Sequence, residues 1–197
     1  RHASADLVDA VVKQFPGELE QIIDTLPADK RPTILLHHGD EEKGIPTVWL
    51  LGWSKDDGTD IHDHRNSEVG INVLRGTVEE KIYVCGDECK FSPRNAAYYA
   101  GDKGIEVHSN SRDLRAGSSM GLNSPYIHEV FGTAGKGEKK DITVHAYFPP
   151  LLNMTYYKHD AKNSRLIFDG EWAEGVETSE EDKKKKAAAA AAAKDAA

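Results

Sequence analysis

Near the start of the chain, apolar residues recur at the three- and four-residue steps of an amphipathic helix. They form two groups, which are Leu7, Val11, Val12 and Phe15, then Leu19, Ile22, Ile23 and Leu26. The pair Pro16-Gly17 separates the two groups, and Pro followed by Gly interrupts a helix. The pattern therefore predicts two short helices between residues 4 and 26.

From residue 33 to about 157, short runs rich in Val, Ile, Tyr and Trp replace the helical pattern, and clusters of Gly, Asp, Asn and Ser separate them. The predicted strands are Ile34–Leu36, Thr47–Trp53, Val69–Leu74, Val78–Val84, Ala96–Tyr99, Ile127–Phe131 and Ile142–Phe148. Such spacing predicts an antiparallel barrel or jelly roll. The expected fold is thus mainly β, with short helices at the N-terminal end.

The length of 197 residues suits one domain with a single core. We expect a helical segment over residues 1–30 packed on a barrel over 31–175. Residues 176–197 contain a charged run and then unbroken alanine, with no patterned apolar face. We expect this stretch to be a solvated tail.

Charge and cysteine content narrow the function. The net charge of −8 argues against a nucleic-acid partner, which needs a basic face. No apolar run approaches the ~20 residues of a membrane helix. Cys85 and Cys89 are too few for a disulfide framework, and a Cys-x3-Cys metal half-site would lack a second pair. We therefore expect two unlinked thiols and a reducing, cytoplasmic setting.

The placement of three histidines suggests a metal site. In Ile61-His62-Asp63-His64, the two imidazoles are two positions apart, so on a strand they point to the same side and can hold one metal ion. His128, on a later predicted strand, is the candidate third ligand. Three neutral imidazoles without a carboxylate suit a divalent transition metal, and iron fits this donor set.

A second polar group lies on one face of the predicted strand 142–148. There a Thr143 hydroxyl can hold one ring nitrogen of His145, and the Tyr147 hydroxyl can hold the other. Such a chain fixes the orientation of a group beside a metal. An ordinary buried polar trio is the alternative. His38, at the end of the first predicted strand, is a further candidate to face the pocket.

The histidine spacing resembles the cupin pattern, in which His-x-His is followed at fixed distances by Glu and Gly. This chain keeps that register through Gly76 but has Val69 at the Glu position. Residues 33–158 resemble cysteine dioxygenase and the wider thiol dioxygenases. The resemblance rests on Ile-His-Asp-His at 61–64 nine residues after Trp53, on His128, and on His-Ala-Tyr-Phe-Pro-Pro at 145–150.

The resemblance implies a cupin barrel that binds Fe(II) through His62, His64 and His128. It also implies that Thr143, His145 and Tyr147 form the relay that is Ser-His-Tyr in the family. The expected reaction adds both atoms of O2 to a small thiol and gives a sulfinate. Two alternatives stay open: another metal-dependent cupin enzyme, such as a carbon-cleaving dioxygenase or an isomerase, and a non-catalytic cupin that binds a small molecule.

Departures from the family pattern bear on the substrate. Val69 replaces the Cys that crosslinks to the relay tyrosine in mammalian-type enzymes, and Leu36 and Tyr156 occupy positions where the family has a carboxylate-binding Arg. Without such a bidentate clamp, free cysteine is not the favoured substrate. A bulkier, aromatic or cationic thiol is favoured, an ergothioneine-like betaine being one example. The residues expected to contact it are Trp53, Leu36, His38, Val69, Tyr126, Met154 and Tyr156.

Overall fold

The structure, a computed structural model, describes residues 3–26, 32–55, 57–85, 96–97, 100–124, 126–135 and 137–173. Its helices are α1 (Ala3–Gln14), α2 (Pro16–Thr25) and the short 3-10 helix η1 (Gly101–Lys103). Its strands are β1 (Thr33–His37), β2 (Thr47–Trp53), β3 (Ile61–Asp63), β4 (Glu68–Arg75), β5 (Thr77–Cys85), β6 (Ile105–Arg115), β7 (Ser119–Leu122), β8 (Ile127–Gly132), β9 (Asp141–Phe148), β10 (Asn153–Asp160) and β11 (Arg165–Ala173).

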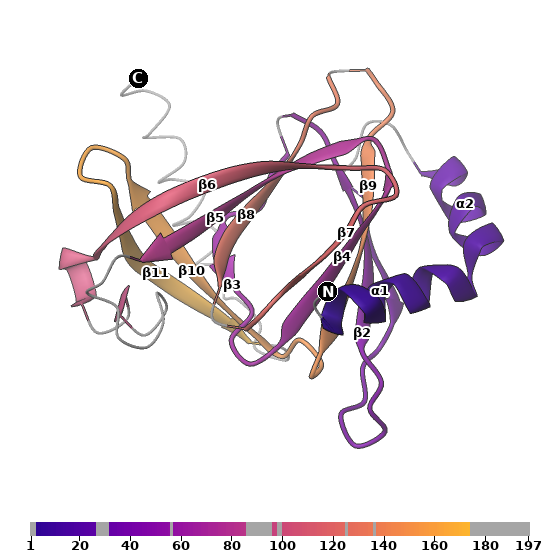
Figure 1. The fold of residues 1–197 in the computed structure, drawn as a ribbon, viewed down its shortest axis with the longest axis horizontal. Coiled ribbons are helices and arrows are strands. Elements are labelled where there is room, and N and C mark those ends of the chain that lie inside the picture. Colours follow the sequence, from indigo (N-terminus) through magenta and orange to yellow (C-terminus); the bar gives the residue numbers. More distant parts are fainter. Residues whose placement is uncertain are drawn as a thin grey trace, which may run out of the picture.

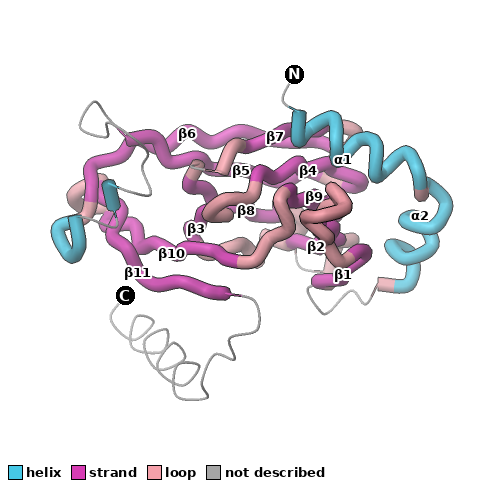
Figure 2. The backbone as a smooth tube through the Cα atoms, turned by 90° about the horizontal axis from the view of Figure 1, so that it is seen from below, coloured by secondary structure: helices cyan, strands magenta, loops and turns pink. Residues whose placement is uncertain are grey.

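The strands form two antiparallel layers. One is a five-stranded sheet in the order β1-β2-β9-β4-β7. The other contains the strands β10-β11-β6-β5-β8-β3, which close into a barrel in this order. Figure 1 shows α1 and α2 on the outer side of the five-stranded sheet, away from β5, β6 and β8. Figure 2 shows β10 and β11 at the end of the molecule opposite these helices. The predicted mainly β architecture with two short helices is confirmed.

Alternation along the strands of the five-stranded sheet separates two cores. The even-numbered residues of β9, such as Ile142 and Val144, pack with Val8 and Leu19 of the helices. Odd-numbered positions face the opposite layer, where a second core contains residues of both layers: Trp53, Val69, Ile71, Val73, Val78, Leu114, Met120, Leu122, Val130 and Tyr147. The odd positions of β9 therefore point into the space between the layers.

Two glycines allow close contacts that the fold needs. A Cβ atom at Gly70 would collide with the carbonyl oxygen of Ser4, so its absence lets the start of α1 lie directly on β4. Gly76 turns the chain from β4 into β5 with a φ of 78°, a conformation that favours glycine. A Cβ there would collide with the carboxylate of Asp141. Gly70 thus sets α1 against its sheet, and Gly76 sets the connection between the two strand layers.

The sequence predictions were accurate for most strands and wrong at two places. Every predicted strand except Ala96–Tyr99 coincides with one in the structure, within one or two residues at each end. Ala96 and Ala97 are helical, in keeping with the high helix propensity of Ala. Cys85 is disulfide-bonded, so the prediction of an unlinked thiol there is wrong; Cys89 lies outside the described residues.

Five strands were not predicted, and two other predictions stay untested. The strands β3 and β7 are only three and four residues long, and charged and polar residues interrupt the apolar pattern of β6, β10 and β11. The tail at 176–197 lies outside the described residues, and the division at residues 30 and 175 stays a prediction. Neither helix at the start of the described chain is long and apolar enough to cross a membrane, and the short η1 is not either.

Candidate metal centre and its pocket

Three histidines meet between the two layers. His62 lies in β3 and is paired across the strands with His128 of β8, while His64 follows directly after β3. The Nε2 atom of His64 is 3.1 Å from that of His62 and 3.4 Å from that of His128. All three side chains are almost completely buried. The structure thus brings together the three residues that the sequence suggested as ligands.

The partners of the other ring nitrogens fix the tautomers. His62 Nδ1 is 2.8 Å from the backbone carbonyl oxygen of Asp60, which can only accept a hydrogen bond. His128 Nδ1 is 2.9 Å from a carboxylate oxygen of Glu80. Both Nδ1 atoms therefore donate, so in the neutral form of each ring the Nε2 atom carries the lone pair. Lone pairs that converge in this way are suited to a cation.

The cluster also fits a metal in charge and spacing. Burial lowers the pKa of His64 well below its usual value, and its three histidine neighbours act in the same direction. His64 is thus neutral, as a ligand must be. Two nitrogens at about 2.1 Å from one ion, with an angle of ~90–110° between them, are roughly 3.0–3.4 Å apart. The two separations from His64 Nε2, 3.1 and 3.4 Å, match this range.

Val69 explains why no carboxylate joins the cluster. It is fully buried and lies opposite Tyr147 in the β4–β9 pairing, facing the interior. Glu68 is the next residue along, and alternation places it on the opposite face of β4. Within the described residues, the only candidate metal-holding group consists of His62, His64 and His128.

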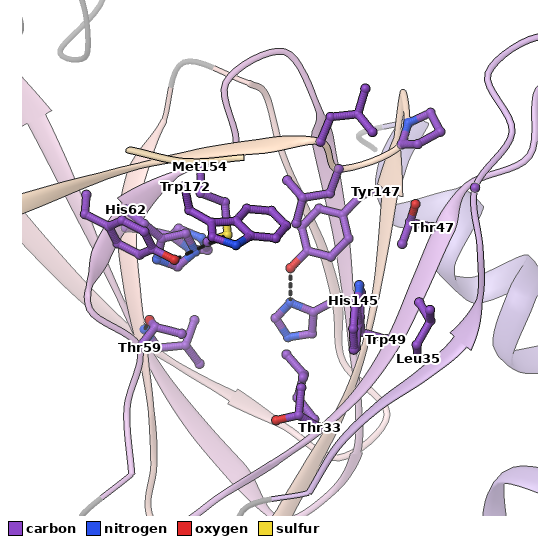
Figure 3. A pocket seen from close by; sticks show the side chains of 18 of the residues that line it. Thr33, Leu35, Thr47, Trp49, Thr59, His62, His145, Tyr147, Met154 and Trp172 are labelled. Carbon is purple, nitrogen blue, oxygen red and sulfur yellow. Dashed lines mark hydrogen bonds between the residues drawn. The ribbon is translucent and has the colours of Figure 1, made fainter. Parts of the chain in front are cut away.

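A chain of hydrogen bonds runs along the inner face of β9, beside the histidines. His145 Nε2 is 3.0 Å from Thr143 Oγ1, and His145 Nδ1 is 3.2 Å from the Tyr147 hydroxyl. Figure 3 shows the second of these contacts inside the pocket. The rings of Tyr147 and His64 have centroids 5.1 Å apart. The predicted trio is therefore connected, and its tyrosine end lies next to the histidine cluster.

The relay has a fourth member that the sequence did not suggest. The indole N–H of Trp53 donates a 2.8 Å hydrogen bond to Thr143 Oγ1, and Trp53 is fully buried. At the other end, burial raises the pKa of Tyr147 well above its usual value, and nearby Tyr156 adds to this. The Tyr147 phenol is thus neutral and able to donate a hydrogen bond at physiological pH.

A cavity of about 630 Å³ opens beside the histidines and the relay. In Figure 3, His62 and Thr59 lie on one side of it, and Trp49 and Leu35 lie on the other. Among the described residues, its lining has no Lys, Arg, Asp or Glu. The lining residues are Thr33, Leu35, His38, Gly39, Thr47, Trp49, Leu51, Trp53, Thr59, His62, His128, Val130, His145, Tyr147, Pro150, Leu151, Leu152, Met154, Tyr156 and Trp172.

Some residues expected at the substrate lie elsewhere. Trp53, His38, Met154 and Tyr156 line the cavity, whereas Leu36, Val69 and Tyr126 do not. Leu36 packs on the helical side of its sheet, because a one-residue change of register reverses the face, and Leu35 lines the cavity instead. Val69 is buried in the core, and Tyr126 is 40% exposed just before β8.

Three important residues were missed from the sequence. Trp49 is four positions before Trp53 on a predicted strand. Because side chains at even spacing share one face of a strand, Trp49 could have been placed in the cavity together with Trp53. Glu80 likewise occupies an inward position of a predicted strand. Trp172 lies in β11, which was not predicted, so nothing in the local pattern indicated its role.

A β-barrel with a buried histidine cluster facing a cavity is characteristic of a metal-binding cupin. The chain belongs to the cysteine dioxygenase type I family, whose model matches residues 3–160. Membership places the protein among the oxygenase enzymes and confirms the cupin fold and the resemblance seen in the sequence. The assignment of individual ligands and relay residues stays a prediction.

Several solved structures are similar to this chain at low sequence identity. Three of them are KdgF from Halomonas sp. (10% identity, TM-score 0.39, 63% of this chain and 82% of that one), TT1209 from Thermus thermophilus (11%, 0.43, 66% and 94%) and a cupin superfamily protein from Desulfitobacterium hafniense DCB-2 (12%, 0.38, 64% and 84%). No curated protein matches the sequence.

Proposed function

We propose that this protein is a non-haem Fe(II) thiol dioxygenase that converts a thiol and O2 into a sulfinate. In this reaction, R–SH and O2 combine to R–SO2H, so both oxygen atoms end on sulfur and no other reductant is needed. The observation that carries the proposal is the position of the Tyr147 ring next to three buried, converging imidazoles. Family membership points to the same class of reaction.

We propose His62, His64 and His128 as the ligands of the iron. Three neutral nitrogen donors leave coordination positions open, as non-haem oxygenases require. Bound iron would supply a position for the thiolate and the electrons that dioxygen needs. Because the three side chains are almost fully buried, the protein itself keeps bulk water away from the ion.

The proposed role of the relay is to aim the Tyr147 hydroxyl into the cavity. The Trp53 indole can only donate, so it occupies an acceptor position on Thr143 Oγ1. The Thr143 hydroxyl then donates to His145 Nε2. His145 Nδ1 in turn donates to the Tyr147 oxygen, which leaves the phenolic proton free to point at the reacting atoms. This polarity makes Tyr147 a hydrogen-bond donor to the substrate or to oxygen.

The lining of the cavity supports a bulky thiol that is neutral or cationic. A carboxylate would find no Lys or Arg among the described lining residues to form the bidentate pair that it prefers. Trp49, Trp53, Tyr156 and Trp172 instead offer aromatic faces, which attract cations. The volume lies in the range of sites for ligands larger than an amino acid. An ergothioneine-like betaine thiol is bulky and carries a quaternary ammonium that these aromatic faces could hold, and its carboxylate would need partners outside the described lining residues.

The disulfide at Cys85 bears on the compartment of the protein. The cytoplasmic location expected from the sequence assumed unlinked thiols, and Cys85 is disulfide-bonded. Stable disulfides are typical of oxidising compartments.

A thiol panel tests the function. Protein purified without oxygen and loaded with Fe(II) is given free cysteine, a mercapto acid, an aminothiol and a betaine thiol, and O2 uptake and sulfinate are measured. With labelled dioxygen, both labelled atoms should appear in the product of the aminothiol or betaine thiol. His128→Ala should abolish turnover, whereas H108A, at an exposed position of β6, should not.

Two results would reject the proposal. One is O2 uptake with no thiol present, which would favour a carbon-cleaving dioxygenase. The other is sulfinate formation undiminished in H128A. Tight binding of a thiol without any turnover would instead indicate a non-catalytic cupin.

A further inference from the structure

One of the three clustered histidines has a buried carboxylate behind it. Glu80 lies on β5, two residues before Ile82, which is paired with His128 of β8. Its side chain has 0% exposure, and its Oε1 is 2.9 Å from His128 Nδ1. A fully buried carboxylate is costly unless it is paired, so this contact needs an explanation beyond packing.

The second oxygen of Glu80 is paired with a cation. Arg112 stands opposite Glu80 in the β5–β6 register, and its Nε is 2.7 Å from Glu80 Oε2. A terminal nitrogen of the guanidinium contacts the sulfur of Met120 at 3.2 Å. The Arg112 side chain is 45% exposed. A single carboxylate therefore connects a partly solvated cation to a buried imidazole.

The histidines differ in this respect. His62 Nδ1 donates to a backbone carbonyl, which is a neutral acceptor, whereas His128 Nδ1 donates to a charged one. A hydrogen bond to a carboxylate is stronger than one to a neutral group. It also makes the other ring nitrogen a stronger electron-pair donor to a metal, because a carboxylate partner raises the basicity of a metal-bound histidine.

We propose that Glu80 is a positioning residue that orients the Nε2 lone pair of His128 and strengthens this nitrogen as a metal ligand. Arg112 weakens this effect of Glu80 on His128. Arg112 shares the negative charge of Glu80, so less of it acts on His128. The inference rests on the proposed metal site but not on the proposed thiol chemistry. A metal-binding measurement without thiol or oxygen therefore tests it separately.

The first test is the affinity of the metal-free protein for Co(II), measured by competition with a chelator. Glu80→Gln keeps an oxygen that can accept from His128 and removes the charge. Its dissociation constant should rise about 10–100-fold, the usual loss when such a partner is changed. Glu129→Gln is the matched control, because this neighbour of His128 contacts Tyr83 and Lys81 instead. It should bind Co(II) like the wild type.

The second test is the reduction potential of the iron-loaded protein. E80Q should raise it, because a weaker donor stabilises Fe(III) less. Arg112→Gln should lower it, because more of the charge of Glu80 then acts on His128. Opposite shifts are not expected of a pair that only holds β5 and β6 together.

The results that would overturn the proposal are equally specific. They are wild-type Co(II) affinity in folded E80Q, or a shift of the potential in the same direction in both variants. If E80Q does not fold, R112Q decides alone, because it leaves Glu80 and His128 in place. An unchanged or raised potential in R112Q then rejects the proposal.

Discussion

The indole N–H of Trp53 donates a 2.8 Å hydrogen bond to Oγ1 of Thr143, a residue ninety positions later in the chain. The bond joins β2 to the relay on β9. It also explains why a threonine can replace the serine of the family pattern: the Oγ1 atom is what Trp53 and His145 both contact, and the extra methyl group does not remove it.

Thr143→Val should damage both stability and turnover, whereas T143S should resemble the wild type. Valine has nearly the same shape but takes the hydrogen-bond acceptor away from Trp53, at a cost of about 1–3 kcal/mol in the free energy of unfolding. It also releases His145, so kcat should fall roughly tenfold. Urea unfolding and steady-state rates check this. Equal rates in both variants would reject the relay.

Replacing the terminal phenol should separate turnover from metal binding. Tyr147→Phe removes the donor that faces the cavity, so kcat should fall about 100-fold, within the range of general acid–base contributions. The Co(II) dissociation constant should stay unchanged, because Tyr147 does not belong to the histidine cluster. Loss of metal with an unchanged rate per bound iron would point to a structural role instead.

Alkaline conditions should destabilise the fold. Burial raises the pKa of Tyr147, and burial with a hydrogen bond to Glu129 raises the pKa of Tyr83. Above about pH 10 the unfolded chain releases phenolic protons that the folded chain retains. The free energy of unfolding should therefore decrease as pH rises, by roughly 1 kcal/mol per pH unit for Tyr147. Urea unfolding of the metal-free protein measures the slope, which Y147F should reduce.

Local pattern was enough to predict the parts of the site that lie on regular strands. Alternation placed Thr143, His145 and Tyr147 on one face, and the His-x-His spacing placed two imidazoles together. Register across strands was not readable in this way. Leu36 was expected at the substrate, but a shift of one residue places its side chain on the helical side, with Leu35 in the cavity.

Long-range partners set the remainder of the site. Trp172 reaches the cavity only because β11 pairs with β10, and the polar composition of β11 hid it. Glu80 looked like one charge in the run Glu-Glu-Lys at 79–81. Its role depends on the fact that β5 lies between β6, which carries Arg112, and β8, which carries His128. Neither neighbour is close in sequence.

Asp141 should matter for stability although it belongs neither to the histidine cluster nor to the relay. Its buried carboxylate accepts hydrogen bonds from the backbone N–H groups of Thr77, Thr133 and Ala134, at 3.0, 2.6 and 2.9 Å. D141N replaces one of these acceptors by a donor, so the free energy of unfolding should fall by about 2–4 kcal/mol. Urea unfolding measures the loss. D40N is the control: the partly exposed Asp40 carboxylate is paired with Lys43 in a surface ion pair, so this change should alter stability little.

A cation introduced into the cavity should change which thiols are accepted. Leu35 lines the cavity from β1, and Leu35→Arg would supply a guanidinium beside the described lining residues. The KM for free cysteine or a mercapto acid should then fall about tenfold, because one charge-assisted pair contributes roughly 1.4 kcal/mol or more. The KM for an aminothiol, which has a cationic group and no carboxylate, should rise through like-charge repulsion. L35Q, of similar length but neutral, separates charge from size, and it should leave the order of preference unchanged. An Arg variant that still prefers cationic thiols would mean that contacts other than charge select the substrate.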